Sequence, residues 1–179
     1  MAHAHLPPAG SDYVFSVTGS SLIDAPREKV WSILMDLPTY SEWNTFVYLI
    51  TLTDASKTPL ADQTPAVGKH LYTEVHMARP KVGKPTGIFT TGSAFVTIDS
   101  LDHANFQVSW STADMPYFLL HTTRWQSLSV DENTGQTKYT TTECFGGFLA
   151  YLVQFFVGSK LRVGFQAAAT SLKARAEQK

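Results

Sequence analysis

Residues 148–177, near the C-terminus, read as a single long helix. In the second half of this segment apolar residues recur at spacings of three and four, the pattern of one buried helix stripe: Leu161, Phe165, Ala168, Ala169, Leu172 and Ala176. In the first half the residues from Tyr151 to Val157 are apolar on nearly all sides. At about 1.5 Å of rise per residue, the helix would be roughly 40 Å long. Such a helix needs a sheet wide enough to pack against it.

The composition indicates a single domain with an aromatic-rich interior. The chain has 179 residues, enough for a sizeable core, and includes 11 Phe, 7 Tyr and 4 Trp. Its 14 basic and 15 acidic residues nearly cancel, and no concentrated basic face is evident, which argues against nucleic acid as a partner. Cys144 is the lone cysteine and excludes an internal disulfide.

The N-terminus carries no segment typical of export. Residues 1–11 are expected to form a flexible tail ahead of one domain spanning 12–179, and His3 and His5 in this tail are more typical of solvated residues than of metal ligands. No apolar secretory segment is evident, and the apolar run at 144–157 is too short to span a bilayer. We therefore expect a cytoplasmic protein without a transmembrane segment.

The spacing of apolar residues changes along the chain and predicts the remaining helices and strands. Residues 13–23 alternate as a first strand, after which Asp24 and Pro26 are expected to open a short helix that Pro38 ends, with a second short helical turn before Asn44. From there the period is two, and six strands are predicted at 45–53, 69–79, 87–99, 105–112, 117–130 and 136–145. No helix interrupts these strands, so neighbours should pair as antiparallel hairpins. The predicted fold is α+β: a curved seven-stranded antiparallel sheet wrapped around the C-terminal helix, with a cavity between them.

Two stretches resemble a known superfamily. Residues 23–31, IDAPREKVW, and 36–44, DLPTYSEWN, resemble the opening signature of the START-like (SRPBCC) superfamily, and the segment from Thr142 into the last helix is also similar to it. The superfamily comprises polyketide cyclase/dehydrase, lipid-transfer and birch-pollen-allergen-like proteins. The resemblance covers nearly the whole chain and implies a helix-grip fold with an apolar tunnel, but fold alone does not select an activity.

The last predicted hairpin places two opposite charges face to face. If DENTGQ forms the turn, Val130 pairs with Thr137, and Arg124 then opposes Glu143 within reach of a charge-assisted pair. Lys138 falls on the other face, which suggests that Arg124 and Glu143 face inward together with Tyr139. One interpretation is a polar anchor or an acid/base in the cavity. The alternatives are a structural ion pair, or an outward pair if the register slips by one residue.

Two histidine-containing faces are weaker candidates. His121, on the alternative face of the same hairpin, is a candidate acid/base by residue type, although a histidine on a strand is more often structural. His70, Glu74 and His76 share one face of the 69–79 strand, but the opposite face is apolar and should point inward, so we predict no metal site. The basic residues Arg79, Lys81 and Lys84 follow on a loop, either at the cavity mouth, at a membrane surface, or simply in solvent.

Aromatic residues are the expected ligand contacts. The predicted contacts come from the region after the short helices, from the last hairpin and from the first half of the long helix: Trp43, Phe46, Tyr139, Tyr151, Leu152, Phe155 and Phe156. Gly158 is expected to mark the change of face within the long helix, and Trp110 and Asp114 are expected to border the entrance. No phosphate loop, nucleophile elbow or dinucleotide fingerprint is evident, so no cofactor is predicted.

Three functions are compatible with these features. The first is a carrier or binding module for a polyketide, terpenoid, lipid or quinone. The second is a cofactor-free cyclase or isomerase of such a molecule, which needs orientation and a few polar contacts rather than a nucleophile. The third is an interaction protein whose cavity is packed shut.

Overall fold

The computed structural model describes residues 12–77, 80–84 and 90–178. The predicted tail at 1–11 and Arg79 lie outside these residues. The elements in chain order are β1 (Tyr13–Ile23), α1 (Arg27–Met35), η1 (Leu37–Thr39), α2 (Tyr40–Trp43), β2 (Val47–Thr53), β3 (His70–His76), β4 (Thr91–Asp102), β5 (Gln107–Thr112), β6 (His121–Val130), β7 (Thr137–Gly146) and α3 (Phe148–Ala176). The predicted order of strand, short helices, six strands and long helix is confirmed.

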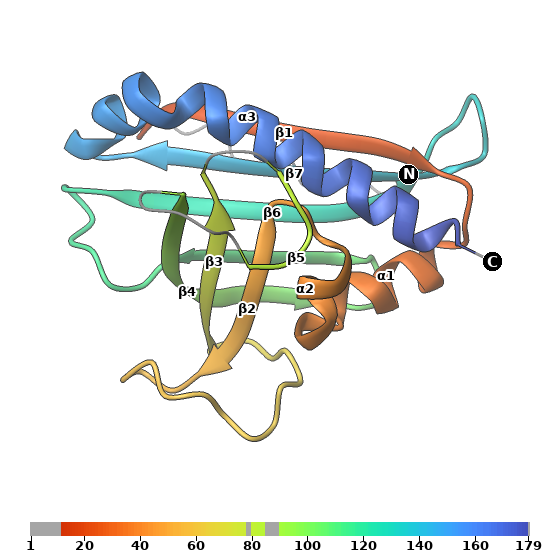
Figure 1. Cartoon of the computed structure of the whole chain (residues 1–179), viewed down its shortest axis with the longest axis horizontal. Coiled ribbons are helices and arrows are strands. Elements are labelled where there is room, and N and C mark those ends of the chain that lie inside the picture. Colours follow the sequence, from red (N-terminus) through yellow and green to blue (C-terminus); the bar gives the residue numbers. More distant parts are fainter. Residues whose placement is uncertain (1–11, 78–79, 85–89, 179) are drawn as a thin grey trace.

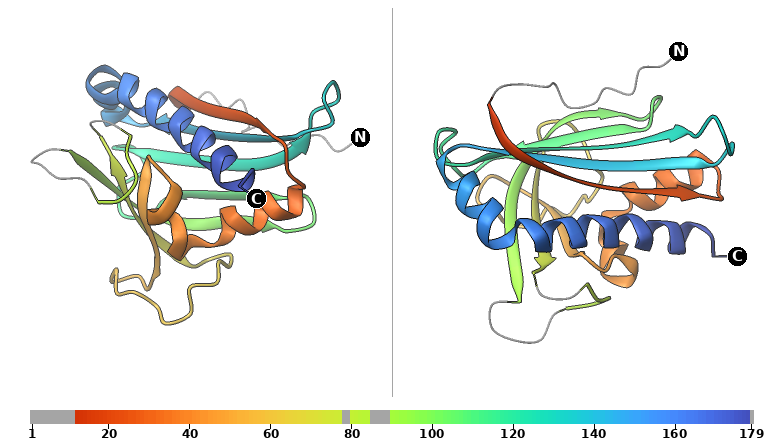
Figure 2. Two further views of the ribbon diagram at one scale, coloured as in Figure 1. Left: turned by 45° about the vertical axis from the view of Figure 1, so that its right-hand side comes forward. Right: turned by 90° about the horizontal axis from the view of Figure 1, so that it is seen from above.

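The strands form one seven-stranded antiparallel sheet in the order β1-β7-β6-β5-β4-β3-β2. Strands β2 to β7 follow one another as a meander, as connections without intervening helices favour. The first strand, β1, pairs with the last strand, β7, and forms one edge of the sheet, with Ile23 opposite Thr137 and Val17 opposite Glu143. The sheet curves strongly, and α3 lies diagonally across its concave side (Figures 1 and 2). This is the predicted helix-grip arrangement.

Close packing between β1 and α3 fixes the helix on the sheet. A Cβ atom at Gly19 would lie 2.3 Å from the backbone oxygen of Phe165, so only glycine permits this approach. Next to it, the Gln166 side chain donates to the Ser20 carbonyl oxygen at 3.0 Å, and the Ser21 hydroxyl donates to the Ala169 carbonyl oxygen at 2.9 Å. The edge strand and the helix backbone are therefore joined directly.

The short helices α1 and α2 lie beside the C-terminal half of α3 (Figure 1). Val30, Trp31 and Leu34 of α1 are buried. Asp24 does not cap this helix, which begins after Pro26 without a side-chain cap. Instead, the Asp24 N–H donates to the Glu177 carboxylate at 2.7 Å and so ties the start of α1 to the end of α3.

By length and composition α3 is the one helix among the described residues that could cross a membrane. In the structure one side of it is buried against the sheet through residues such as Ala150, Leu161, Phe165 and Leu172. This side of the helix therefore belongs to the core of the fold.

Candidate functional site

A cavity of about 400 Å³ lies between the concave face of the sheet and α3. This volume is within the range of small-molecule sites in proteins. Its wall is mainly apolar and includes Ile50, Val96, Trp110 and Phe145. Some lining residues are also exposed to solvent, among them Ser93, Asp114 and Met115, and these mark where the cavity opens. The cavity is therefore neither packed shut nor fully enclosed.

One stripe of α3 faces the cavity along its whole length. Its members recur at spacings of three and four: Val153, Val157, Leu161, Phe165, Ala168 and Leu172. The predicted contacts Tyr151, Leu152, Phe155 and Phe156 are instead exposed on the outside of the helix. The helix is continuous through Gly158, so the face does not change there. This corrects the predicted division of α3, because Val153 and Val157 of the first half face the cavity whereas its large aromatic residues point outward.

The other aromatic residues predicted as ligand contacts do lie in the wall. Trp43 of α2, Phe46 before β2 and Tyr139 of β7 all line the cavity, as do Trp110 and Asp114. A Cβ at Gly164 would lie 2.3 Å from the Phe46 ring, so this ring is held close against α3. Contact of these residues with a ligand stays a prediction.

The predicted register of the β6–β7 hairpin is confirmed. Val130 pairs with Thr137, Leu128 with Tyr139, and Arg124 with Glu143. Arg124, Tyr139 and Glu143 line the cavity, whereas Lys138 is exposed on the convex face. The charged face is therefore the inner one.

Arg124 and Glu143 do not form an ion pair, which corrects the predicted charge-assisted contact. The Arg124 Nε donates to the Thr141 hydroxyl at 3.0 Å. Its guanidinium lies over the Phe165 ring, 4.4 Å from the centroid, and 5.8 Å from the centroid of Trp110. A planar cation on aromatic faces is stabilised without a carboxylate partner. The sequence could place the two residues opposite each other but could not show that aromatic rings from β5 and α3 would hold the guanidinium.

Glu143 presents its carboxyl group to the interior of the cavity. The side chain keeps some accessible surface, but this surface faces the cavity rather than the outer solvent. Burial raises the pKa of the Glu143 carboxyl, while the charge of Arg124 and a hydrogen bond with Thr122 oppose this shift. Because burial disfavours the ionised form, the carboxyl holds its proton to higher pH than an exposed glutamate does.

Two buried hydrogen-bond donors in the wall have no partner among the described residues. Tyr139 donates its hydroxyl to Gln126 Oε1 at 2.5 Å, which leaves the Gln126 Nε2 group free. The indole Nε1 of Trp43 is likewise unpartnered. Buried donors without acceptors cost free energy, so both favour an acceptor supplied from the cavity. The sequence does not single out Gln126, because nothing in a strand pattern distinguishes a paired amide from an unpaired one.

His121 is not part of the cavity. It lies on the convex side of β6, where its ring stacks on Tyr117 at 3.7 Å and its Nδ1 is 2.7 Å from the Tyr117 carbonyl oxygen. The structure therefore does not bring His121 together with Arg124 and Glu143.

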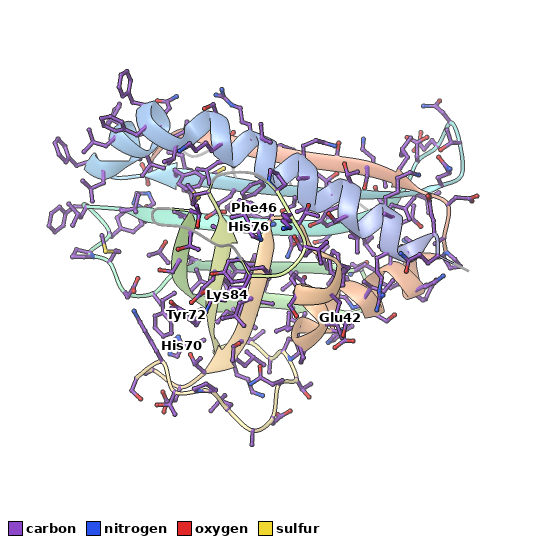
Figure 3. The ribbon with its side chains drawn as sticks, viewed as in Figure 1. Glu42, Phe46, His70, Tyr72, His76 and Lys84 are labelled. Atoms are coloured by element: carbon purple, nitrogen blue, oxygen red, sulfur yellow. The ribbon has the colours of Figure 1, made fainter. Side chains whose placement is uncertain are left out.

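The polar face of β3 is held by local contacts. His70 Nδ1 is 3.0 Å from the Thr97 hydroxyl, His76 Nε2 is 2.8 Å from the Gly83 carbonyl oxygen, and Tyr48 donates to Glu74. Figure 3 shows Tyr72 and His70 along β3, and Phe46 near His76, whose backbone N–H donates to the Phe46 carbonyl oxygen at 2.8 Å. Within residues 12–77, 80–84 and 90–178, no three His, Cys, Asp or Glu side chains are grouped as metal ligands.

Lys57 is a rim residue that the sequence did not reveal. It lies on the loop between β2 and β3, lines the cavity, and forms an ion pair of 2.8 Å with Asp114 on the loop between β5 and β6. The predicted basic group on the following loop is different: Lys81 and Lys84 do not line this cavity. A contact between loop residues that are far apart in the sequence produces no periodic pattern from which the sequence could reveal it.

Comparison with known proteins identifies fold relatives only. The Zhui aromatase/cyclase from Streptomyces sp. R1128 superposes with a TM-score of 0.67 at 12% identity, covering 91% of this chain and 93% of that one. Ginseng major latex-like protein 151 from Panax ginseng gives 0.61 at 8% identity, covering 92% and 98%. A START superfamily protein from Mycobacterium smegmatis gives 0.58 at 16% identity, covering 91% and 97%. No protein-family model and no curated protein sequence matches the chain.

Proposed function

We propose that this chain, which has the START-like helix-grip fold, binds a small hydrophobic molecule in its cavity as a carrier or binding module. The observation that carries the proposal is the cavity of about 400 Å³, whose wall is mainly apolar and carries the polar side chains of Arg124, Gln126 and Glu143 on the β6–β7 hairpin. Ligand sites typically combine an apolar wall with a few placed polar groups that orient the ligand. A cytoplasmic location stays a prediction.

The polar groups favour a ligand that carries acceptor oxygens. Trp43 Nε1 and Gln126 Nε2 are buried donors without partners among the described residues, and the Arg124 guanidinium can only donate. A carbonyl or phenolic oxygen would satisfy them, whereas a pure hydrocarbon would leave them unpaired. Oxygenated polyketides, terpenoids, quinones and fatty acids meet this requirement.

Paired ligands of one skeleton test this preference. We expect a naphthoquinone to bind more tightly than naphthalene, measured by calorimetric or fluorescence titration. Replacing Gln126 by Leu should weaken naphthoquinone binding by about two- to tenfold, the value of one hydrogen bond, and leave naphthalene binding unchanged or stronger. Ser127→Ala, on the convex side of the same strand, is the matched control. Equal affinity for naphthoquinone and naphthalene would contradict the role of Gln126 as a hydrogen-bond donor to the ligand. Binding of neither ligand would count against the proposed binding function.

A second candidate function is a cofactor-free cyclase or isomerase. The specific observation is Glu143, a carboxyl of raised pKa inside the cavity and opposite Arg124. When an enol carbon of the ligand attacks a carbonyl carbon, negative charge develops on the carbonyl oxygen, and an arginine can stabilise this charge. A protonated carboxyl can then give its proton to that oxygen, and the carboxylate so formed can take up the proton that the enol releases. Two fold relatives, the Zhui protein and the di-domain BexL, are described as aromatase/cyclases.

The two candidates differ in one outcome. With a polyketide or terpenoid intermediate, a cyclase would yield a changed product distribution that Glu143→Gln abolishes. A carrier would return the intermediate unaltered and would bind it with either residue at this position.

A further inference from the structure

The first half of α3 exposes large apolar side chains that the fold does not cover. Together with neighbours from the connection between β5 and β6 they form what we call the exposed aromatic surface: Met115, Tyr117, Phe118, Phe148, Tyr151, Leu152, Phe155 and Phe156. Phe155 is 83% exposed and Phe118 75% exposed. Contiguous exposed apolar surface of this kind marks an interaction site.

The two segments of this surface are joined by backbone hydrogen bonds. Phe148 N donates to the Phe118 carbonyl oxygen at 3.0 Å, and Leu149 N donates to the Leu119 carbonyl oxygen at 2.8 Å. Gly147 has a positive φ of 87°, and a Cβ there would lie 2.8 Å from the Leu119 backbone. The surface is therefore built into the fold at one end of the molecule, where α3 begins and β6 begins (Figure 1).

The same segments line the cavity with their other side chains. Val153 and Val157 of α3 and Met115 and Leu120 of the β5–β6 connection are lining residues. Because Met115 is also exposed, the exposed aromatic surface borders the place where the cavity opens. Whatever covers this surface lies beside the cavity opening.

The charge around the surface favours an anionic partner. Helix α3 contains no acidic residue, and Lys160 and Arg162 are exposed directly after the aromatic turns. The nearby carboxylates are engaged, Asp114 by Lys57 and Asp12 by Tyr117. Exposed aromatic residues beside basic ones are typical of a helix that lies in the interface of an anionic bilayer.

Hydropathy and geometry agree with a helix that lies on a bilayer. Helix α3 is long and apolar enough in composition to cross a bilayer, yet only 28% of its most apolar stretch is buried. The helix cannot leave the sheet to span the bilayer without losing its packing on β1, so its outer side is the part available to lipid. A twofold dimer through this surface would place Lys160 and Arg162 against their copies without acidic partners on the helix, which disfavours a second copy as the occupant.

We propose that the exposed aromatic surface docks on an anionic lipid bilayer, with Phe148, Phe155 and Phe156 inserted among the lipids and Lys160 and Arg162 at the headgroups. Docking places the cavity opening at the bilayer surface. A hydrophobic ligand then passes between the bilayer and the cavity with little exposure to water. This passage rests on the proposed function, whereas docking on the bilayer is independent of it.

Vesicle flotation tests the proposal with the full chain. Wild-type protein should float with phosphatidylcholine vesicles that contain phosphatidylserine, and less with phosphatidylcholine alone. Phe155→Ser should lower the partition constant by about tenfold, the scale on which one buried aromatic ring changes partitioning. The double variant Lys160→Gln, Arg162→Gln should lose the preference for phosphatidylserine. Val130→Ser, an exposed apolar residue at the far end of β6, should change nothing.

Unchanged melting temperatures will show that these exposed substitutions leave the fold intact. The proposal is overturned if wild-type protein stays with the aqueous fraction, or if Phe155→Ser floats as well as wild type. It is also overturned if light scattering shows a wild-type dimer that Phe155→Ser converts to a monomer while neither protein binds vesicles, because the surface is then an interface between copies of this chain.

Discussion

Arg124 and Glu143 stand directly opposite each other on β6 and β7, yet the arginine is held by Thr141 and the Phe165 ring rather than by the carboxylate. The guanidinium lowers the pKa of Glu143 from a distance, but burial outweighs it and the net pKa is raised. The cavity thus contains a cation and a carboxyl whose ionisation is disfavoured by burial.

Glu143→Gln should remove a pH-dependent penalty on stability. The ordinary pKa of the carboxyl is 4.5, and folding raises it. Below pH 4.5 both states hold the proton and the wild-type protein carries no ionisation penalty; as the pH rises from there through the folded pKa, wild-type stability falls. The variant should therefore be more stable than wild type at neutral pH, and this advantage should shrink toward pH 4. Urea unfolding between pH 4 and pH 8 measures the difference.

Glu177→Gln is the matched control with the opposite sign. The pKa of Glu177 is lowered by the Asp24 N–H and by Lys173. The wild-type carboxylate therefore stabilises the fold above the ordinary pKa of 4.5, and this contribution is lost as the pH falls through the lowered folded pKa. Glu177→Gln should be less stable than wild type at neutral pH. Curves of the same sign for both variants would contradict the assignment of Glu143 to a buried carboxyl.

Arg124→Met should raise the pKa of Glu143 further. The guanidinium is the main opposing influence on this carboxyl, so its removal leaves burial less compensated. Carbon-13 NMR of the Glu143 carboxyl measures the titration directly. Arg175→Met, which breaks an exposed pair with Glu42, should leave that titration unchanged. A Glu143 pKa that does not move in Arg124→Met would show that the two groups are not coupled.

Alanine at Gly19 should be strongly destabilising, and alanine at Gly158 should not. The new Cβ at position 19 meets the Phe165 backbone oxygen at 2.3 Å, and forcing β1 and α3 apart should cost about 1–3 kcal/mol or more. At Gly158 a Cβ would lie 3.9 Å from the Gln154 side chain and from the Val153 carbonyl oxygen, so alanine should stabilise the helix by roughly 0.5–1 kcal/mol. Thermal unfolding of the two variants provides the comparison. Equal changes in melting temperature would contradict the close approach of β1 and α3 at Gly19.

Substitutions on the two sides of α3 should have different effects on ligand binding. Val157→Phe places a larger side chain in the cavity and should weaken ligand binding in solution by about tenfold or more. Phe155→Ser alters the outer side and should leave binding in solution unchanged. Titration with an apolar fluorescent dye separates them. Loss of binding in Phe155→Ser with retention in Val157→Phe would restore the division of α3 expected from sequence.

The sheet and its pairing were accessible from the sequence because strand alternation and turn residues are local signals. The β6–β7 register follows from one turn, since each residue from Val130 back to Arg124 then has a fixed partner. The inward direction of that face follows from Lys138, which is exposed on the other side. The periodicity of α3 also predicts its buried stripe from Leu161 to Ala176.

The site itself was only partly accessible, because its properties depend on contacts between distant segments. Phe155 and Phe156 were expected to line the cavity because apolar residues usually lie inside a fold, but here they cover the outside of α3. Extending the stripe of Leu161 back by steps of four reaches Val157 and Val153, a signal that the sequence does contain. The cation–aromatic contact of Arg124 and the unpartnered amide of Gln126 have no such signal, because they depend on side-chain positions in three dimensions.

The most direct test of the central claim is mass spectrometry of small molecules extracted from the protein after purification from its native host. We predict one dominant hydrophobic compound bearing carbonyl, hydroxyl or carboxyl oxygens, bound near one equivalent per chain and strongly reduced in Val157→Phe purified in the same way. An extract without any such compound, from a protein that also fails to bind apolar dyes, would contradict the account.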